Sequence, residues 1–246
     1  MDPSLYPRMA AVEDSHWWFA SRRAICARIL DRVTLPTGAA ILEPGCGTGG
    51  NFPMLARRGK LYAMDADPSA LNFAASRGLA EVAEGSLPGH IPFGDMRFDL
   101  VVMTDVLEHL DDEAGSLRAL HARLKPGGSI LLTVPALQWL WSEHDVTHHH
   151  RRRYQAEELR RLASAAGFKV DYLSYYNFIL FPLIAGVRIL QRMRPSPANG
   201  ANGRHDLAMP SRRLNAVLTG LFSSERHFLG ATRFPIGISL ILLAHV

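Results

Sequence analysis

Residues 41–50, ILEPGCGTGG, decide the fold, because a short apolar run is followed there by an acid and by a loop with four glycines. The apolar run begins at Ala39 and is too short for a helix, so it predicts a buried strand that ends at Glu43. Glycine has no side chain, which lets the main chain approach another molecule closely. A bare loop directly after a buried strand therefore predicts a ligand site at this edge of a sheet.

Strand-like and helix-like segments alternate on both sides of this stretch. Apolar residues at roughly helical spacing predict a helix over 8–35. The expected strands that follow are 39–43, 60–67, 79–86, 97–105 and 129–135, and the expected helices between them are 51–59, 68–78 and 111–128. Alternation at this spacing predicts right-handed βαβ units and a buried parallel sheet.

The alternation of strands and helices stops after Pro135, where residues 136–154 form a predicted loop rich in Trp, His and Arg. The Pro/Gly/Asn-rich tract at 194–206 is predicted to be mobile. The other expected elements are helices at 156–168, 178–193 and 210–228 and strands at 169–177 and 236–246.

The composition limits the kind of protein. Of 246 residues, 48% are apolar and 20% are charged, which excludes a wholly disordered chain. The net charge of +4 is scattered and lacks an aromatic–basic platform, so no nucleic-acid partner is expected. Two cysteines make no disulfide framework, and we recognise neither a secretory signal nor a bilayer-spanning run. We expect a cytoplasmic protein, either soluble or attached to a membrane surface.

Three small molecules account for such a glycine loop: a nucleotide phosphate, a dinucleotide or S-adenosylmethionine. A phosphate loop needs Gly-Lys followed by Ser or Thr, and asparagine follows the last glycine here instead. Gly45, Gly47 and Gly50 satisfy the dinucleotide pattern, and Asp65 follows the first of them by twenty residues. Glu43 disfavours a dinucleotide, because its carboxylate would repel a pyrophosphate but suits an ammonium group and a sulfonium.

Four stretches carry a family resemblance in their order and spacing: ILEPGCGTGG (41–50), YAMDADPS (62–69), FDLVVMTDVLEHL (98–110) and LKPGGSILLTVP (124–135). They resemble the class I S-adenosylmethionine-dependent methyltransferases, in the small-molecule branch that includes the ubiquinone-biosynthesis methyltransferases. The resemblance implies an α/β, Rossmann-like sheet of seven strands in the order 3-2-1-4-5-7-6, with the last strand antiparallel. It also implies S-adenosylmethionine as the cofactor.

The same resemblance implies one methyltransferase domain over residues 1–246. Its core is expected at 36–177 and 231–246, with a helical N-terminal cover at 1–35 and a helical insertion at 178–230 before the last strand.

The resemblance assigns cofactor contacts residue by residue. The loop glycines let the backbone approach the methionine part, Glu43 lies near its ammonium group, and Asp65 accepts hydrogen bonds from the ribose hydroxyls. Family members often have Asp where this chain has Ser86, so Ser86 is either an adenine contact or a turn residue. The expected set is Glu43, Gly45, Cys46, Gly47, Gly49, Asp65, Ala66, Ser86, Leu87, Thr104 and Asp105.

The stretch DVLEHL, residues 105–110, allows three interpretations. His109 is a candidate general base for a protonated acceptor. The grouping of Asp105, Glu108 and His109 also resembles a metal-binding motif of some relatives. The favoured interpretation is structural, with Glu108 and His109 orienting the start of the next helix, and we assign no metal site.

The loop at 136–154 is expected to face the substrate, because imidazoles accept protons near neutral pH and arginines bind carboxylate or phosphate. A solvated charged loop is the alternative. At the N-terminus, Trp18 is expected either to close the pocket or simply to pack, with Arg22 or Arg23 near the cofactor carboxylate. The further candidate bases are His144, His148 and His149, and the candidate substrate contacts are Arg152, Arg153, Tyr154 and Trp18.

The insertion bears on the methyl acceptor, because its two apolar helices are flanked by arginines. Such helices are suited to lie in a membrane interface, to line an apolar ligand pocket or to form an oligomer interface. We expect a small-molecule or lipid-linked acceptor, methylated on oxygen rather than on carbon or nitrogen, with membrane-surface contact through 178–230 as an option. An NAD(P)-dependent oxidoreductase and a catalytically silent cofactor-binding partner subunit are the alternatives. The oligomeric state is not predicted.

Overall fold

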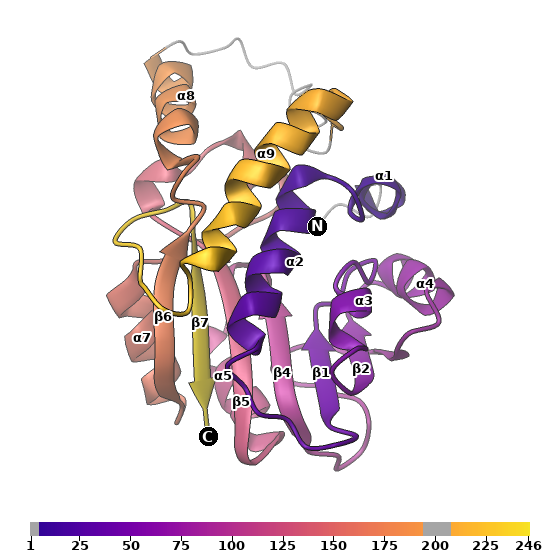
Figure 1. Ribbon diagram of the computed structural model, residues 1–246. Coiled ribbons are helices and arrows are strands. Elements are labelled where there is room, and N and C mark those ends of the chain that lie inside the picture. The colour runs from indigo at the N-terminus through magenta and orange to yellow at the C-terminus, as the bar shows by residue number, and fades with distance from the viewer. Residues whose placement is uncertain (1–4, 194–207) are drawn as a thin grey trace.

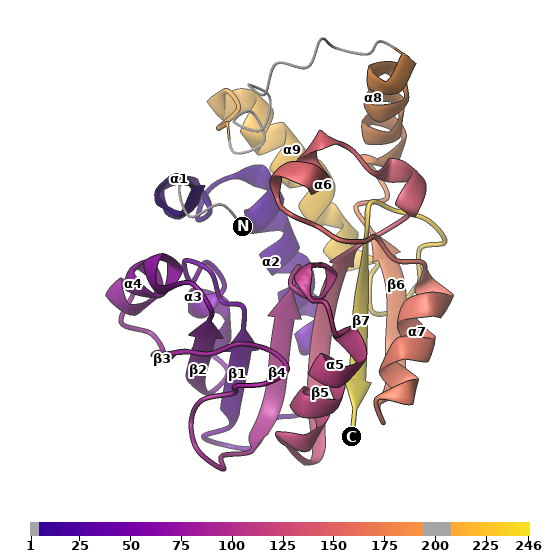
Figure 2. The same ribbon diagram turned by 180° about the vertical axis from the view of Figure 1, so that it is seen from behind.

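The computed structural model describes residues 5–193 and 208–246, which form a mixed sheet with helices on both faces (Figures 1 and 2). The sheet has seven strands in the order β3-β2-β1-β4-β5-β7-β6, as predicted. Strand β7 is antiparallel to both of its neighbours, and the other pairs are parallel. The strands are β1 Ala40–Pro44, β2 Lys60–Asp65, β3 Glu81–Glu84, β4 Phe98–Thr104, β5 Leu124–Pro135, β6 Lys169–Tyr176 and β7 Ser239–His245.

The helices divide between the two faces of the sheet. Along the central strands side chains alternate, so that Leu42 and Ile130 pack with α5 and α7, whereas Ile41 and Leu131 pack with α2, α3 and α9. The helices are α1 Tyr6–Val12, α2 Trp17–Leu30, α3 Phe52–Leu55, α4 Pro68–Ser76, α5 Glu113–Ala122, α6 Glu143–Thr147, α7 Ala156–Ala165, α8 Phe181–Met193 and α9 Arg212–Ser224. Single 3-10 turns occur at η2 Leu107–His109, η3 Gln138–Leu140 and η5 Glu225–His227.

The predicted single helix at 8–35 is wrong, because the residues between α1 and α2 are not helical. His16 adopts an extended conformation, with ψ of 133°, and its ring nitrogen accepts a hydrogen bond from the Trp18 amide. This arrangement caps a new helix, which ends the continuity that the apolar spacing suggested. The break brings Glu13 and His16 into the interior, where both side chains are buried.

Three other sequence predictions need correction. Helix 51–59 shrinks to the single turn α3. Helix 111–128 ends at Ala122, and LKPGG starts β5, where Leu124 pairs with Phe98 before a β-bulge. The segment 136–154 is not wholly a loop, because it contains η3 and α6. The tract at 194–206 lies outside the described residues.

Helices α2 and α9 pack side by side as one layer, whereas α1 packs against α4 (Figure 1). The Trp17 amide donates to Asn215 Oδ1 at 2.9 Å, and the Asn215 amide group donates back to the Ser15 carbonyl at 2.9 Å. Phe222 is fully buried among Trp17, Trp18 and Tyr176, with ring centroids 5.4 to 6.0 Å away. Both tryptophans therefore pack on the insertion. The division into one domain with a cover at 1–35 and an insertion at 178–230 stays a prediction.

None of the helices in the described ranges is both long and apolar enough to cross a bilayer. The helices α8 and α9 instead extend beyond the carboxyl ends of the parallel strands, on the same side as α1 (Figures 1 and 2).

Replacing Phe222 by alanine is expected to lower the free energy of unfolding by about 3–5 kcal/mol, because a buried ring is lost and a cavity remains. Urea denaturation followed by circular dichroism measures the change. Phe228→Ala is the matched control, because that ring is 53% exposed, and it should cost less than about 0.5 kcal/mol. Equal losses in the two variants would show that α9 is not held through Phe222.

Candidate active site

The glycine loop after β1 is bare because other side chains fill the space around it. Gly45 has φ of +68°, and a Cβ there would lie 2.4 Å from a methyl of Val106. A Cβ on Gly50 would lie 2.2 Å from the carboxylate of Glu13. The amides of Gly45 and Cys46 both donate to the Met64 carbonyl, at 2.7 and 3.0 Å, which fixes the loop to the end of β2.

Glu43 lies at the end of β1 and is 2% exposed. Asn51 donates to its Oε1 at 2.8 Å and also to Thr104 Oγ1 at 3.0 Å. The Oε2 atom of Glu43 is buried and has no hydrogen-bond partner within residues 5–193 and 208–246. Burial raises the pKa of Glu43 to about 8, against the opposing hydrogen bond from Asn51. A cation placed at Oε2 would restore the charged form.

Asp65, at the end of β2, is held by two backbone donors. The Gly47 amide donates to Oδ2 at 2.8 Å, and the Asp67 amide donates to Oδ1 at 3.0 Å. Burial nevertheless raises the pKa of this carboxyl above its usual value. Each oxygen keeps a second lone pair, so Asp65 is able to accept hydroxyl donors from the cavity.

Asp105, at the end of β4, pairs with Arg22 of α2. It adopts a left-handed conformation with φ of +55°, and Thr133 Oγ1 donates to its Oδ1 at 2.9 Å. The residues are 83 positions apart in sequence, so the sequence gives no local signal for this pair. Both residues line the cavity, and Arg22 is paired there with a protein carboxylate.

Glu13 connects the N-terminal cover to the glycine loop. It is not among the site residues predicted from the sequence. Thr48 Oγ1 donates to Glu13, and Arg77 Nη2 donates to the same Oε1 at 2.7 Å. Arg77 also donates from Nε to the Thr48 carbonyl at 2.8 Å. Cover, loop and α4 thus share one buried charge cluster.

Histidines gather at the other end of the site. The ring centroids of His109 and His150 are 4.9 Å apart, and those of His144 and His148 are 4.3 Å apart. Burial, followed by the neighbouring His150, lowers the pKa of His109 to about 4. Its imidazole is therefore neutral near pH 7, and it is a weak base.

The arginines of the 136–154 segment turn toward the protein. Arg153 is 5% exposed and forms a bidentate ion pair with Asp145, at 2.8 and 3.0 Å. Arg152 pairs with Glu113, and the Tyr154 hydroxyl donates to the same carboxylate at 2.6 Å. These contacts order the segment over the start of α5.

These side chains surround one cavity of about 1320 Å³ at the carboxyl edge of the sheet. Four predicted site residues do not line it: Gly49, His149, Arg152 and Tyr154. Polar lining residues outside the predicted set include Glu13, His16, Asn51 and His150. The predicted residues that do line it are Trp18, Glu43, Gly45, Cys46, Gly47, Asp65, Ala66, Ser86, Leu87, Thr104, Asp105, His109, His144, His148 and Arg153.

Comparison with known proteins agrees with this geometry. A family model described as a methyltransferase domain matches residues 18–173. A probable S-adenosylmethionine-dependent methyltransferase of Mycolicibacterium smegmatis is 28% identical over 162 residues, which cover 64% of this chain and 62% of the relative. A malonyl-[acyl-carrier protein] O-methyltransferase of Dechloromonas aromatica is 31% identical over 231 residues, which cover 90% of this chain and 83% of the relative.

Among solved structures, a chain from the complex between the Haloferax volcanii Trm112 methyltransferase activator and its partner methyltransferase superposes with a TM-score of 0.63. It is 17% identical and covers 98% of this chain and 94% of that chain, a likeness that shows the fold alone. The chain described here spans about three fifths of the length of the mycobacterial relatives that it matches. From the family match and the fold, this chain belongs to the class I S-adenosylmethionine-dependent methyltransferases.

The raised pKa of Glu43 predicts a specific pH dependence of stability in the cofactor-free protein. Between its ordinary value of 4.5 and about 8, the folded chain binds a proton that the unfolded chain has lost, so stability falls as pH rises. The slope is up to ~1.4 kcal/mol per pH unit. Glu43→Gln removes this contribution, so the variant should gain stability relative to the wild type between about pH 5 and pH 8. Urea denaturation across that range measures it, and parallel curves for the two proteins would contradict the prediction.

Proposed function

We propose that the protein transfers a methyl group from S-adenosylmethionine to an oxygen atom of a small or lipid-linked acceptor. The observation that carries the cofactor assignment is the buried Oε2 of Glu43, which lacks a partner beside a bare loop. An ammonium group placed there would donate to Oε2 and restore the charged form, whereas a pyrophosphate has no donor to offer. The residues present therefore fit S-adenosylmethionine better than a dinucleotide.

The proposed cofactor contacts follow from the cavity. Glu43 holds the ammonium group and Asp65 accepts the ribose hydroxyls, while Gly45 and Gly47 allow close approach of the backbone. Ser86 and Leu87 line the same cavity, and we propose that they border the adenine. When bound, the cofactor supplies an electrophilic methyl group on a sulfonium. The protein holds the acceptor in line with it and excludes water.

The proposal of an oxygen acceptor rests on the relative of Dechloromonas aromatica, whose name assigns it O-methylation of a carrier-linked malonyl group. The candidate bases that line the cavity are His109, His144 and His148. Because the pKa of His109 is lowered to about 4, we favour His144 or His148 for removal of an acceptor proton. Arg152 and Tyr154, both engaged with Glu113, are not retained as substrate contacts.

An apolar acceptor is supported by the rim of the cavity. Leu183 and Val187 of α8 line it and are 62% and 46% exposed, and Leu190 continues the same stripe at 60% exposed. On α9, Leu214 and Val217 are 51% and 57% exposed. Apolar stripes of this kind suit an acyl chain or a lipid surface. We propose that both helices contact the apolar part of the acceptor at a membrane surface, in an otherwise cytoplasmic protein.

Glu43→Gln and Asp65→Asn are each expected to weaken S-adenosylmethionine binding about 10–100-fold, because each removes a charge-assisted contact. Isothermal titration calorimetry measures the affinity. Asp95→Asn is the matched control, because Asp95 is exposed and lies outside the cavity lining, and it should bind like the wild type.

The same titrations separate the alternatives. Binding of NAD⁺ without binding of S-adenosylmethionine would contradict the methyltransferase assignment. Tight cofactor binding without transfer of labelled methyl to any acceptor in a lipid and metabolite panel would support the silent partner subunit.

Leu183→Asp combined with Leu190→Asp is expected to abolish co-sedimentation with anionic liposomes, because two charges interrupt the apolar stripe of α8. Leu79→Asp, a single substitution of a leucine that is 42% exposed near β3, is the control and should pellet like the wild type. If the wild type stays in the supernatant at low salt, membrane contact is removed from the proposal, and the cofactor assignment is unaffected.

A further inference from the structure

Glu108 is a buried carboxyl group in the cavity lining that lacks a hydrogen-bond partner among the described residues. Its side chain is fully buried, and neither carboxylate oxygen has a hydrogen-bond partner in the part of the chain that the structure describes. His150 Nε2 lies 3.9 Å from Oε1, which is too far for a hydrogen bond. Arg22 and Arg153 act on Glu108 only from a distance, and a buried carboxyl group without a hydrogen bond is costly, so its retention here points to a ligand at its two oxygens.

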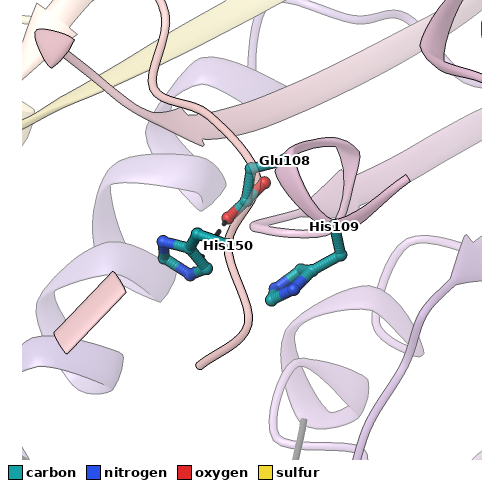
Figure 3. Close-up of side chains that lie close together, drawn as sticks. All are labelled: Glu108, His109 and His150. Atoms are coloured by element: carbon teal, nitrogen blue, oxygen red, sulfur yellow. Dashed lines mark ion pairs between the residues drawn. The ribbon is translucent and has the colours of Figure 1, made fainter. Parts of the chain in front are cut away.

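Two imidazoles face this carboxylate, as Figure 3 shows. Glu108 and His109 come from η2, and His150 comes from the segment after α6. One ligand atom from each of the three residues lies within 4.8 Å of the other two. Two ligands at about 2.0–2.2 Å from one metal are at most about 4.4 Å apart, so a single ion would contact all three after the side chains close by a few tenths of an ångström or more.

The outer nitrogens of both rings are already engaged. His150 Nδ1 lies 2.8 Å from Asp145 Oδ1, and His109 Nδ1 lies 3.4 Å from the His149 carbonyl oxygen. A carboxylate and a carbonyl only accept, so each Nδ1 carries a proton, and in the neutral imidazole each Nε2 then presents a lone pair. Metal-ligating histidines show this arrangement, with the second nitrogen bound to a carboxylate or a carbonyl.

The supporting carboxylate is itself fixed. Asp145 is fully buried and receives both arms of Arg153 as well as the Ser142 amide at 2.9 Å. This network sets the orientation of His150 before any ion binds. The buried Arg153, predicted to contact substrate, has a positioning role in this arrangement.

We propose that Glu108, His109 Nε2 and His150 Nε2 bind one divalent transition-metal ion of the zinc, cobalt or iron(II) type. Two imidazoles and one carboxylate suit these ions, whereas magnesium and calcium prefer oxygen ligands. All three residues line the cavity, so the remaining coordination positions face it. If the proposed methyl transfer holds, these positions are available to oxygen atoms of the acceptor, which makes a chelating oxygen acceptor the favoured class.

Equilibrium dialysis of the chelator-treated, full-length protein against zinc chloride or cobalt chloride tests the site without any methyl donor. We expect one ion per chain, and visible absorption bands of bound cobalt(II). Glu108→Gln, His109→Ala and His150→Ala should each weaken binding at least tenfold. The matched controls Glu84→Gln and His227→Ala change exposed residues outside the cavity and should bind like the wild type.

A second measurement uses the wild-type protein and so does not depend on whether the variants fold. In ¹⁵N-labelled wild-type protein, zinc should shift the Nε2 resonances of two histidines while their Nδ1 nitrogens stay protonated. Absence of a stoichiometric ion, unchanged histidine resonances, or equal affinity in the folded ligand variants would overturn the proposal. Calorimetry with S-adenosylmethionine in the presence of chelator keeps this outcome separate from the cofactor assignment.

Discussion

The burial of several carboxylates around one cavity is the constraint on which the site depends. Parallel strands end at the same sheet edge, so Glu43, Asp65 and Asp105 converge there from β1, β2 and the end of β4. Each buried carboxylate needs a partner. Arg22 compensates Asp105, and two backbone amides hold Asp65.

Two buried carboxyl groups remain under-compensated, and both line the cavity. Glu43 has one amide partner for one oxygen, beside the glycine loop. Glu108 has no hydrogen-bond partner in the described chain, beside the histidines. The first suits the ammonium group of the cofactor, and the second suits a metal ion. The same deficit of positive charge thus supports both proposals at separate positions.

The cover and the insertion complete the site together. Helix α2 brings Arg22 to the end of β4 and is itself held by α9 through Asn215 and Phe222. The α1–α2 break places Glu13 against the glycine loop. The apolar stripe of α8 forms the rim at which a lipid-like acceptor is proposed to enter.

Most of the sheet was predictable, because strand length, alternation and glycine turns act between near neighbours in sequence. The strand order followed from family motifs, and the structure confirms it. Helix boundaries were less predictable. The capping of α2 by His16 and the pairing of Leu124 with Phe98 override the local spacing of apolar residues.

The sequence by itself determined the bare loop, the acids at the strand ends and the cofactor class that they suit. Only the tertiary structure decided which charged residues meet, because Arg22 and Asp105 are 83 positions apart and Thr48 and Glu13 are 35 apart. It paired Arg153, a predicted substrate contact, with Asp145, and it brought His150 to Glu108 and His109. Such contacts depend on how helices pack on a sheet, and no periodicity along the chain encodes them.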